Sequence, residues 1–528
     1  MKYPIGIQSF DRIRNEGYVY VDKTALIYQL VTTGSIYFLS RPRRFGKSLL
    51  VSTLEHYFLG HKELFKGLAM ELLEQDWLEY PVFHMDFNNT QFEKSGNLEN
   101  KINIYLTAWE QIYGALPVKG DLGDRFAYVL EQAHKQTGRR AVVLIDEYDK
   151  PLLDVLDSGR MTIEDGQEIL LEEQHRNILK GFYSVFKGAD AHLQFVLLTG
   201  VTKFSQVSVF SGFNQPKDLS MHPAYDTLCG ITKDELYSYF AEQIQELAQK
   251  KSRTEEQIKL DLKRHYDGYH FSPEMHGVYN PFSLLNCFDT MRMEDYWFKS
   301  GTPTYLVRLL SHTQEQINDM VGQYYFPEEF VDYKATVEQP LPMIYQSGYL
   351  TIKDYDPEMN SFLLDFPNNE VKKGFLTLVA TSYLQPQERI ISWIQLAVKA
   401  LRQGKIEQFR DQLTAFLASV PYSMRRRQDE REYERYFHYT FYLLLRLLSV
   451  YMVYSEKEQS QGRVDCIVET PDYVYIFEFK LDGSAEQALQ QIKDKGYAKP
   501  YFTDPRKLYQ IGVNFSSETG TIEGFKYE

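Results

Sequence analysis

Cysteine is scarce in this chain of 528 residues, which contains only Cys229, Cys287 and Cys466, each far from the others. An odd number of scattered cysteines supports neither a disulfide framework nor a cysteine-based zinc site. We therefore expect the protein to work in a reducing compartment, the cytoplasm.

Long apolar runs are also missing. The most apolar stretch, Phe441–Tyr454, contains Arg446 and is shorter than the roughly 20 residues that a membrane helix needs. The first residues lack the basic and then apolar pattern of a secretory signal. We expect no membrane-spanning segment and no membrane partner.

An excess of positive charge is absent too, because the formal net charge is −14. This balance argues against a surface coated in positive potential, so a nucleic acid would have to be held locally. Hydrophobic residues reach 43%, and glycine and proline number only 31 and 20, which excludes a disordered or fibrous chain. At roughly 150 residues per domain, the length predicts about three globular domains.

Residues 1–220 alternate short apolar runs with longer amphipathic stretches, a rhythm typical of an α/β domain with a mainly parallel sheet. The expected strands are Ser35–Leu39, Val82–Phe87, Ala141–Ile145 and Leu193–Leu198. The expected helices between them are Lys47–Leu59, Leu98–Ile112, Arg125–Gln136 and Gly166–Phe186. Such helices give each parallel strand the crossover connection that it needs.

Residues 221–422 are predicted to form a mostly helical lid or connector, and the charged segment Ser423–Glu432 a boundary. The expected connector helices include Thr232–Leu247, Glu255–His265 and Ile391–Val420. Residues 423–528 are predicted to form a second, smaller α/β domain. Its expected elements are a helix at Glu434–Leu448, a strand at Val450–Tyr454, a hairpin over Val464–Lys480 and a helix at Ala485–Gly496.

A phosphate-binding signal follows the first expected strand, which leads through the residues SRPRRFGKS into a helix. In this context Gly46 and its neighbours expose backbone N–H groups at a helix N-terminus, where they can hold phosphate oxygens. The Lys47 ammonium can bridge the β- and γ-phosphates, and the Ser48 hydroxyl can bind Mg²⁺. The motif therefore predicts a P-loop that binds ATP and Mg²⁺.

An arginine stands where the usual loop pattern has its first glycine, because Arg41 precedes Gly46 by five positions. Arg41, Arg43 and Arg44 can supply extra phosphate contacts, and one of them can stabilise the charge of the transition state. The alternative is that these arginines face solvent or acidic neighbours.

Two carboxylates provide the partner motif that the loop requires. The apolar run Ala141–Ile145 is typical of a buried central strand, and Asp146 and Glu147 follow at its carboxyl end, where α/β sheets hold ligands. We expect Asp146 to hold Mg²⁺ and Glu147 to orient or deprotonate the attacking water. Asp149, on the next loop, can take either role.

The expected strand Leu193–Leu198 also ends in polar residues. Thr199 or Thr202 is a candidate contact to the γ-phosphate or to the catalytic water, and Lys203 can stabilise transition-state charge. The alternative is an ordinary turn, in which threonine and lysine are common.

A second constellation lies near the end of the chain. Glu478 and Lys480 are two residues apart on one expected strand and share a face, and Asp465 on the paired strand can join them. Two carboxylates can hold Mg²⁺ against a phosphodiester while the ammonium positions water, which is the charge logic of a metal-dependent nuclease. The alternative is a cross-strand attraction between exposed charges.

Flanking helices can extend this cluster. Glu434 is a candidate third acid for the metal, and Gln491 can hydrogen-bond the substrate or the lysine. His438 follows Glu434 by one helical turn, where it can contact phosphate or be an ordinary, partly buried histidine.

Both constellations, in this order, resemble those of the bacterial AAA-ATPase-like proteins with a C-terminal PD-(D/E)XK nuclease domain. The likeness spans nearly the whole chain and includes the stretches YPIGIQSFDRIRNEGYVYVDKT, RPRRFGKSLL, VVLIDEYDKPL, LLTGVTKFS, HYDGYHF, YNPFSLL, GRVD, IFEFK and ALQQIKDKGY. The family's loop is also arginine-rich, so the resemblance makes Arg41 a family trait. It implies that Lys47, Ser48, Asp146 and Glu147 serve nucleotide and Mg²⁺, and that Asp465, Glu478, Lys480 and Gln491, with Glu434, form the nuclease-like site.

The sequence therefore predicts a protein that binds and hydrolyses ATP and whose nucleotide state controls a Mg²⁺-dependent nuclease domain through the connector. DNA or RNA is the expected macromolecular partner, and oligomerisation is compatible with the sequence. The alternative is a nucleotide-dependent switch or scaffold, whose C-terminal domain binds a partner without cleaving it.

Overall fold

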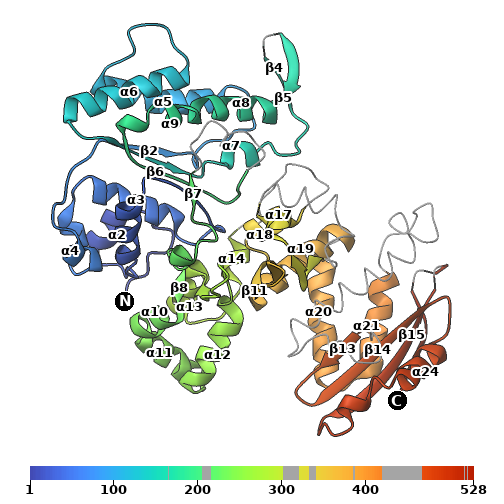
Figure 1. The fold of residues 1–528 in the computed structure, drawn as a ribbon. Coiled ribbons are helices and arrows are strands. Elements are labelled where there is room, and N and C mark those ends of the chain that lie inside the picture. Colours follow the sequence, from blue (N-terminus) through green and yellow to red (C-terminus); the bar gives the residue numbers. More distant parts are fainter. Residues whose placement is uncertain are drawn as a thin grey trace. The chain divides into compact units, whose positions relative to one another are not determined.

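The computed structural model describes residues 1–164, 166–204, 216–300, 320–331, 340–384, 387–418, 466–516, 518–519 and 521–528, with the side chains of residues 380–391 left out. These residues form two compact units, Met1–Val371 and Lys372–Glu528 (Figure 1). The domain limits predicted near residues 220 and 422 stay predictions.

A five-stranded parallel sheet organises the first part of the chain, with the strand order β2-β3-β6-β1-β7. Its strands are β1 (Ile36–Ser40), β2 (Val82–Asp86), β3 (Ala141–Asp146), β6 (Leu193–Gly200) and β7 (Lys217–Asp218). Every residue of β3 is buried, as expected for a central strand of a sheet covered on both faces. The predicted α/β fold and its four predicted strands are therefore confirmed.

Helices lie on both sides of this sheet, with α5, α6 and α8 on one side and α2 and α3 on the other (Figure 1). The helices of this part are α1 (Phe10–Asn15), α2 (Thr24–Thr33), α3 (Lys47–Phe58), α4 (Ala69–Leu73), α5 (Asn97–Tyr113), α6 (Leu122–Thr137), α7 (Lys150–Leu153), α8 (Leu171–Tyr183) and α9 (Val185–Gly188). The crossover helices predicted at 47–59, 98–112 and 125–136 are thus confirmed.

One predicted helix begins too early. Residues 167–170 belong to a hairpin of β4 (Met161–Glu164) and β5 (Gln167–Leu170), and α8 starts only at Leu171. Gly166 lies at the turn with φ of 81°, a left-handed backbone that suits a hairpin turn and not the start of a helix. The helical prediction for 166–186 is therefore wrong over its first residues.

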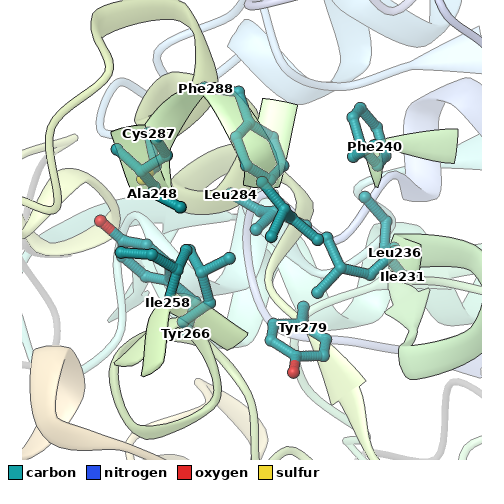
Figure 2. Packing of buried hydrophobic residues seen from close by; sticks show 13 residues of the cluster. Ile231, Leu236, Phe240, Ala248, Ile258, Tyr266, Tyr279, Leu284, Cys287 and Phe288 are labelled. Carbon is teal, nitrogen blue, oxygen red and sulfur yellow. The ribbon is translucent and has the colours of Figure 1, made fainter. Parts of the chain in front are cut away.

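The middle of the chain is mainly helical, as predicted. It contains α10 (Lys233–Tyr239), α11 (Ala241–Lys251), α12 (Glu255–Tyr266), α13 (Pro281–Thr290), α14 (Tyr296–Lys299), α17 (Pro327–Phe330) and α18 (Leu341–Gln346), with the short strands β8 (Ile231–Thr232) and β9 (Val278–Tyr279). The helix predicted over Thr232–Leu247 is broken at Phe240, whose ring is buried against Phe288 in the cluster that joins α10–α13 (Figure 2).

A small antiparallel sheet in this region was not predicted. Its strands are β10 (Gln323–Tyr325), β11 (Thr351–Asp356) and β12 (Ser361–Asp365), with β12 in the centre. Because β11 and β12 form a hairpin, the chain can pair them locally within a helical region.

The second unit holds a four-stranded mixed sheet in the order β13-β14-β15-β16. Its elements are β13 (Cys466–Glu469), β14 (Tyr473–Leu481), β15 (Lys507–Phe515), β16 (Ile522–Tyr527), α20 (Gln387–Arg402), α21 (Ile406–Ala418) and α24 (Ala485–Lys495). Helix α19 (Asn369–Leu384) starts in the first unit and continues into the second. The hairpin and the helix α24 confirm the prediction, whereas the helix and strand expected at 434–454 lie outside the described residues.

The helix predicted over Ile391–Val420 is two helices in the structure. Gly404 lies between α20 and α21 with φ of 68°, a left-handed conformation that ends a helix. A side chain on Gly404 would also meet the ring of Tyr473 on β14 at 2.5 Å. The break therefore lets the helix pair pack closely against the sheet.

Candidate functional site

The loop between β1 and α3 has the form expected for a phosphate-binding loop. Gly46 has φ of 93° and a Cβ built on it would meet no atom within 4 Å, so the residue takes a left-handed conformation beside open space. Helix α3 begins at Lys47 without a side-chain cap. The N–H groups of its first turn therefore remain able to bind an anion.

Lys47 lies across this loop and reaches the strand β3. Its Nζ donates hydrogen bonds to the carbonyl oxygens of Arg41 at 3.0 Å and Pro42 at 3.3 Å, and it lies 3.7 Å from Glu147 Oε1. The side chain is only 4% exposed. The glycine-lysine-serine loop and the Asp146-Glu147 strand end therefore meet at one place.

The carboxylate of Asp146 is positioned by the neighbouring strand. Thr199 on β6 donates a hydrogen bond from its Oγ1 to Asp146 Oδ1 at 2.5 Å. Both residues are buried, and Thr199 lies beside Leu39 at the end of β1 in the parallel register. The three strand ends that carry the loop, the acids and Thr199 are therefore adjacent.

Asp149 holds the end of β6 through one of its carboxylate oxygens. Its Oδ2 accepts hydrogen bonds from the backbone N–H groups of Val201 and Thr202 and from the Thr202 hydroxyl, at 2.6–2.9 Å. Burial, with a smaller effect of Glu147, raises the pKa of Asp149 to about 6. Asp149 and Thr202 therefore support the strand end, and the role of Asp149 in place of Asp146 or Glu147 stays a prediction.

Lys203 pairs with an acid on the next strand. Its Nζ lies 2.9 Å from Asp218 Oδ2, while its backbone N–H donates to Gln346 Oε1. Of the three predicted candidates, Thr199 bonds Asp146, whereas Thr202 bonds Asp149 and Lys203 pairs with Asp218.

The three loop arginines differ in their surroundings. Arg41 is 1% exposed and donates hydrogen bonds to the carbonyl oxygens of Ser40, Ser220 and Tyr225, and its guanidinium lies 4.1 Å from the ring centre of Phe271. These contacts occupy the Arg41 side chain with backbone carbonyls and do not support its predicted contact with phosphate, while the alternative that it faces solvent is wrong. Arg43 and Arg44 are exposed, so contact with phosphate stays a prediction for them.

Residues from beyond the sheet support the loop, and sequence reasoning did not assign them this role. Phe45 packs edge-on against the rings of Tyr269 and Phe271, with centroids 4.7 and 5.6 Å away. The indole Nε1 of Trp297 donates to the Arg43 carbonyl at 3.0 Å. The aromatic stretch HYDGYHF supplies Tyr269 and Phe271, so its family resemblance is the sequence signal for the contact with Phe45.

The C-terminal unit brings together the described members of the second cluster. Glu478 and Lys480 lie on one face of β14, and Gln491 on α24 joins them, because its Nε2 donates to Glu478 Oε1 and its Oε1 accepts from Lys480 Nζ at 2.5 Å. Glu478 is 2% exposed. Asp465, Glu434 and His438, the other predicted members, lie outside the described residues.

Gly512 fixes how closely α24 approaches this sheet. A Cβ on Gly512 of β15 would stand 2.1 Å from the carbonyl oxygen of Ala485 and 2.7 Å from the N atom of Leu489. Only glycine permits this approach, which places Gln491 beside β14.

The two sites differ in how well their described residues fit Mg²⁺. At the loop, the Ser48 hydroxyl and the Asp146 carboxylate are oxygen ligands of the kind that Mg²⁺ combines with substrate phosphates and water. Within the described ranges, no group of three histidine, cysteine, aspartate or glutamate side chains has a geometry suited to a metal ion. The loop site therefore fits a metal ion that is bound together with a nucleotide. In the C-terminal cluster, Glu478 is the predicted metal ligand that lies within the described residues.

Comparisons with known proteins give matches to both halves of the chain. Residues 4–210 match the AAA-ATPase-like family model, described as a predicted AAA-ATPase, and residues 432–525 match a model of the PD-(D/E)XK nuclease superfamily. A protein of Azotobacter chroococcum mcd 1, named "Uncharacterized protein in vnfD 5'region", is 36% identical over 534 residues, which cover 100% of this chain and 99% of that protein. Among the helices of the described ranges, none combines the length and the apolar character of a membrane-spanning segment.

Proposed function

Since this chain belongs to the family of AAA-ATPase-like proteins with a C-terminal PD-(D/E)XK nuclease superfamily domain, we propose that it binds and hydrolyses ATP at the loop of residues 40–48. The observation that carries the proposal is the position of Lys47, which bonds the loop carbonyls and lies 3.7 Å from Glu147. This contact supports a shared site for a triphosphate and an attacking water.

Each residue of the site has a role that its position supports. The uncapped N–H groups at the start of α3 bind phosphate oxygens, and Lys47 leaves the carbonyls to neutralise the β- and γ-phosphates. Ser48 and Asp146 hold Mg²⁺, with Thr199 fixing the Asp146 carboxylate. Mg²⁺, when bound, neutralises charge on the phosphate oxygens.

Glu147 acts on the water. It orients the water for attack on the γ-phosphorus and accepts its proton, while the bond from that phosphorus to the bridging oxygen breaks to give ADP and inorganic phosphate. Glu147 has φ of 54°, which turns the chain sharply after Asp146. Because of this turn, Asp146 and Glu147 need not point the same way, which supports a metal-binding role for Asp146 and a role in orienting water for Glu147.

A second proposal concerns the C-terminal unit, which we assign to Mg²⁺-dependent cleavage of DNA or RNA phosphodiesters. The link from Glu478 through Gln491 to Lys480 supports it, because the link holds an acid and an ammonium side by side on one sheet face. Asp465 and Glu434 complete the proposed metal site. In this proposal the nucleotide state of the first unit controls cleavage.

ATP hydrolysis by the full chain with Mg²⁺ tests the first proposal. Lys47→Ala is expected to abolish hydrolysis, and Lys353→Ala is a matched control because Lys353 also donates to two backbone carbonyls, those of Gly268 and Pro367. Equal hydrolysis by Lys47→Ala and the parent, or no hydrolysis by the parent, would contradict the proposal.

Cleavage of several DNA and RNA forms, with and without ATP, tests the second. Cleavage is expected to require Mg²⁺ or Mn²⁺ and to disappear in Asp465→Ala and in Lys480→Ala while the fold survives. If the nucleic acids stay intact at millimolar metal while ATP still changes partner binding, the chain is a nucleotide-dependent switch.

A further inference from the structure

Trp297 connects the phosphate loop to a distant part of the first unit. Its indole Nε1 donates to the Arg43 carbonyl at 3.0 Å, across 254 positions of sequence. The side chain is 6% exposed and packs edge-on against the ring of Tyr349, with centroids 5.1 Å apart. A buried indole whose only polar atom bonds a loop carbonyl fixes the position of that carbonyl.

The backbone of the same residue is bonded to Glu370. The Trp297 N–H donates to Glu370 Oε1 at 2.6 Å, and Glu370 is 1% exposed. A carboxyl so deeply buried keeps its place only while its hydrogen bonds persist. One residue therefore ties the loop to Glu370 by two hydrogen bonds.

Glu370 is the second residue of α19, which runs from the first compact unit into the second. The start of this helix is fixed further by Asn368, whose Oδ1 accepts from the Val371 N–H and whose Nδ2 donates to the Asp267 carbonyl. Movement of Trp297 therefore acts on the first turn of the helix that leaves the unit.

We infer that Trp297 is a positioning residue that couples the phosphate loop to the first turn of α19 through Glu370. The inference rests on the proposed nucleotide binding and specifies its regulatory output. A nucleotide on the loop biases the position of the Arg43 carbonyl, and the indole bond transmits that bias to Trp297 and to Glu370. The coupling is reciprocal, so the state of α19 also changes nucleotide affinity.

The test uses the full chain and the fluorescent nucleotide N-methylanthraniloyl-ATP with Mg²⁺. Affinity is measured by titration, and hydrogen–deuterium exchange of residues 369–379 is measured with and without ATP. In the parent, ATP is expected to change exchange in the first turn of α19. Trp297→Phe, which keeps a ring but removes the N–H donor, is expected to bind nucleotide about two- to tenfold more weakly and to lose the exchange change.

Trp393→Phe is the matched control. Trp393 is also 6% exposed, and its Nε1 donates to the Gln412 carbonyl at 3.0 Å, away from the loop. This variant is expected to keep the parent's affinity and exchange change. Should Trp297→Phe not fold, Glu370→Gln, which keeps an acceptor for the Trp297 N–H, is expected to transmit the change and Glu370→Ala to lose it.

Two failures are distinguishable. A parent that binds no nucleotide overturns the proposed function and the coupling with it. If the parent and the Trp297→Phe variant both bind nucleotide, and if ATP changes hydrogen exchange in α19 equally in both, the coupling alone is overturned.

Discussion

The Nζ atom of Lys47 lies 3.7 Å from Glu147 Oε1, although the two residues are 100 positions apart. Lys47 follows β1 and Glu147 follows β3, and β6 lies between these two strands in the sheet. The contact therefore depends on parallel strands whose carboxyl ends meet at one edge. It places an ammonium group and a carboxylate where the proposed chemistry needs them.

Arg41 and Arg43 are expected to respond differently to replacement by alanine. Arg41→Ala removes three hydrogen bonds to backbone carbonyls, two of them buried, and the contact with Phe271, and is expected to lower the free energy of unfolding by roughly 2–4 kcal/mol. Arg43→Ala changes an exposed side chain and is expected to leave stability within about 0.5 kcal/mol. Urea unfolding checks both values, and equal losses in the two variants would contradict the scaffold role of Arg41.

Gln491 is expected to matter for the stability of the C-terminal unit. Gln491→Ala removes one donor from the buried Glu478 carboxylate and an acceptor from Lys480, and is expected to cost about 1–3 kcal/mol. Gln490→Ala is the control, because Gln490 lies on the same helix, is exposed and bonds Asp494. The two variants are compared by the unfolding of the full chain, with hydrogen exchange in β14 as the readout. Equal destabilisation by Gln490→Ala and Gln491→Ala would refute the role of Gln491 in holding Glu478 and Lys480.

Glu370 is expected to make stability depend on pH. Burial raises the pKa of Glu370 to about 8 from its ordinary value of 4.5. Between these pH values the folded chain holds a proton that the unfolded chain has released, so the contribution of Glu370 to the free energy of unfolding is largest below pH 4.5 and falls as pH rises toward 8. Glu370→Gln carries no titrating proton and is expected to lose less stability over this range.

Thermal unfolding at pH 5 and pH 8.5 measures this effect. The midpoint of the parent is expected to fall further between the two values than that of Glu370→Gln, since other groups titrate alike in both proteins. Equal falls of the unfolding midpoint in the parent and in Glu370→Gln would show that Glu370 does not cause the pH dependence.

Local sequence patterns are sufficient to predict the strands of the parallel sheet and the acids at its edge. The run Ala141–Ile145 is apolar without interruption, which is typical of a strand buried on both faces, and this predicts that the acids after it lie at the carboxyl edge of the sheet. Glu478 and Lys480 were placed on one face by the two-residue period of a strand. Gln491 was placed beside them by the helical pattern that follows.

Other features depend on contacts that sequence patterns do not contain. The Trp297 contact to Arg43 joins residues 254 apart, and the burial of Arg41 depends on the carbonyls of Ser220 and Tyr225. Long helical patterns also hide breaks, since Phe240 and Gly404 interrupt helices for reasons of packing against Phe288 and Tyr473. Tertiary contacts override local preference at these positions.

Parallel measurement of ATP binding and hydrolysis in Glu147→Gln tests the central claim, that the loop and the strand end form one site for a triphosphate. The variant keeps Lys47, Ser48 and Asp146 but lacks the base, so ATP affinity is expected to stay within about threefold and kcat to fall by roughly 10²–10⁴-fold. Hydrolysis at the parent's rate, with ATP bound equally well, would contradict the account.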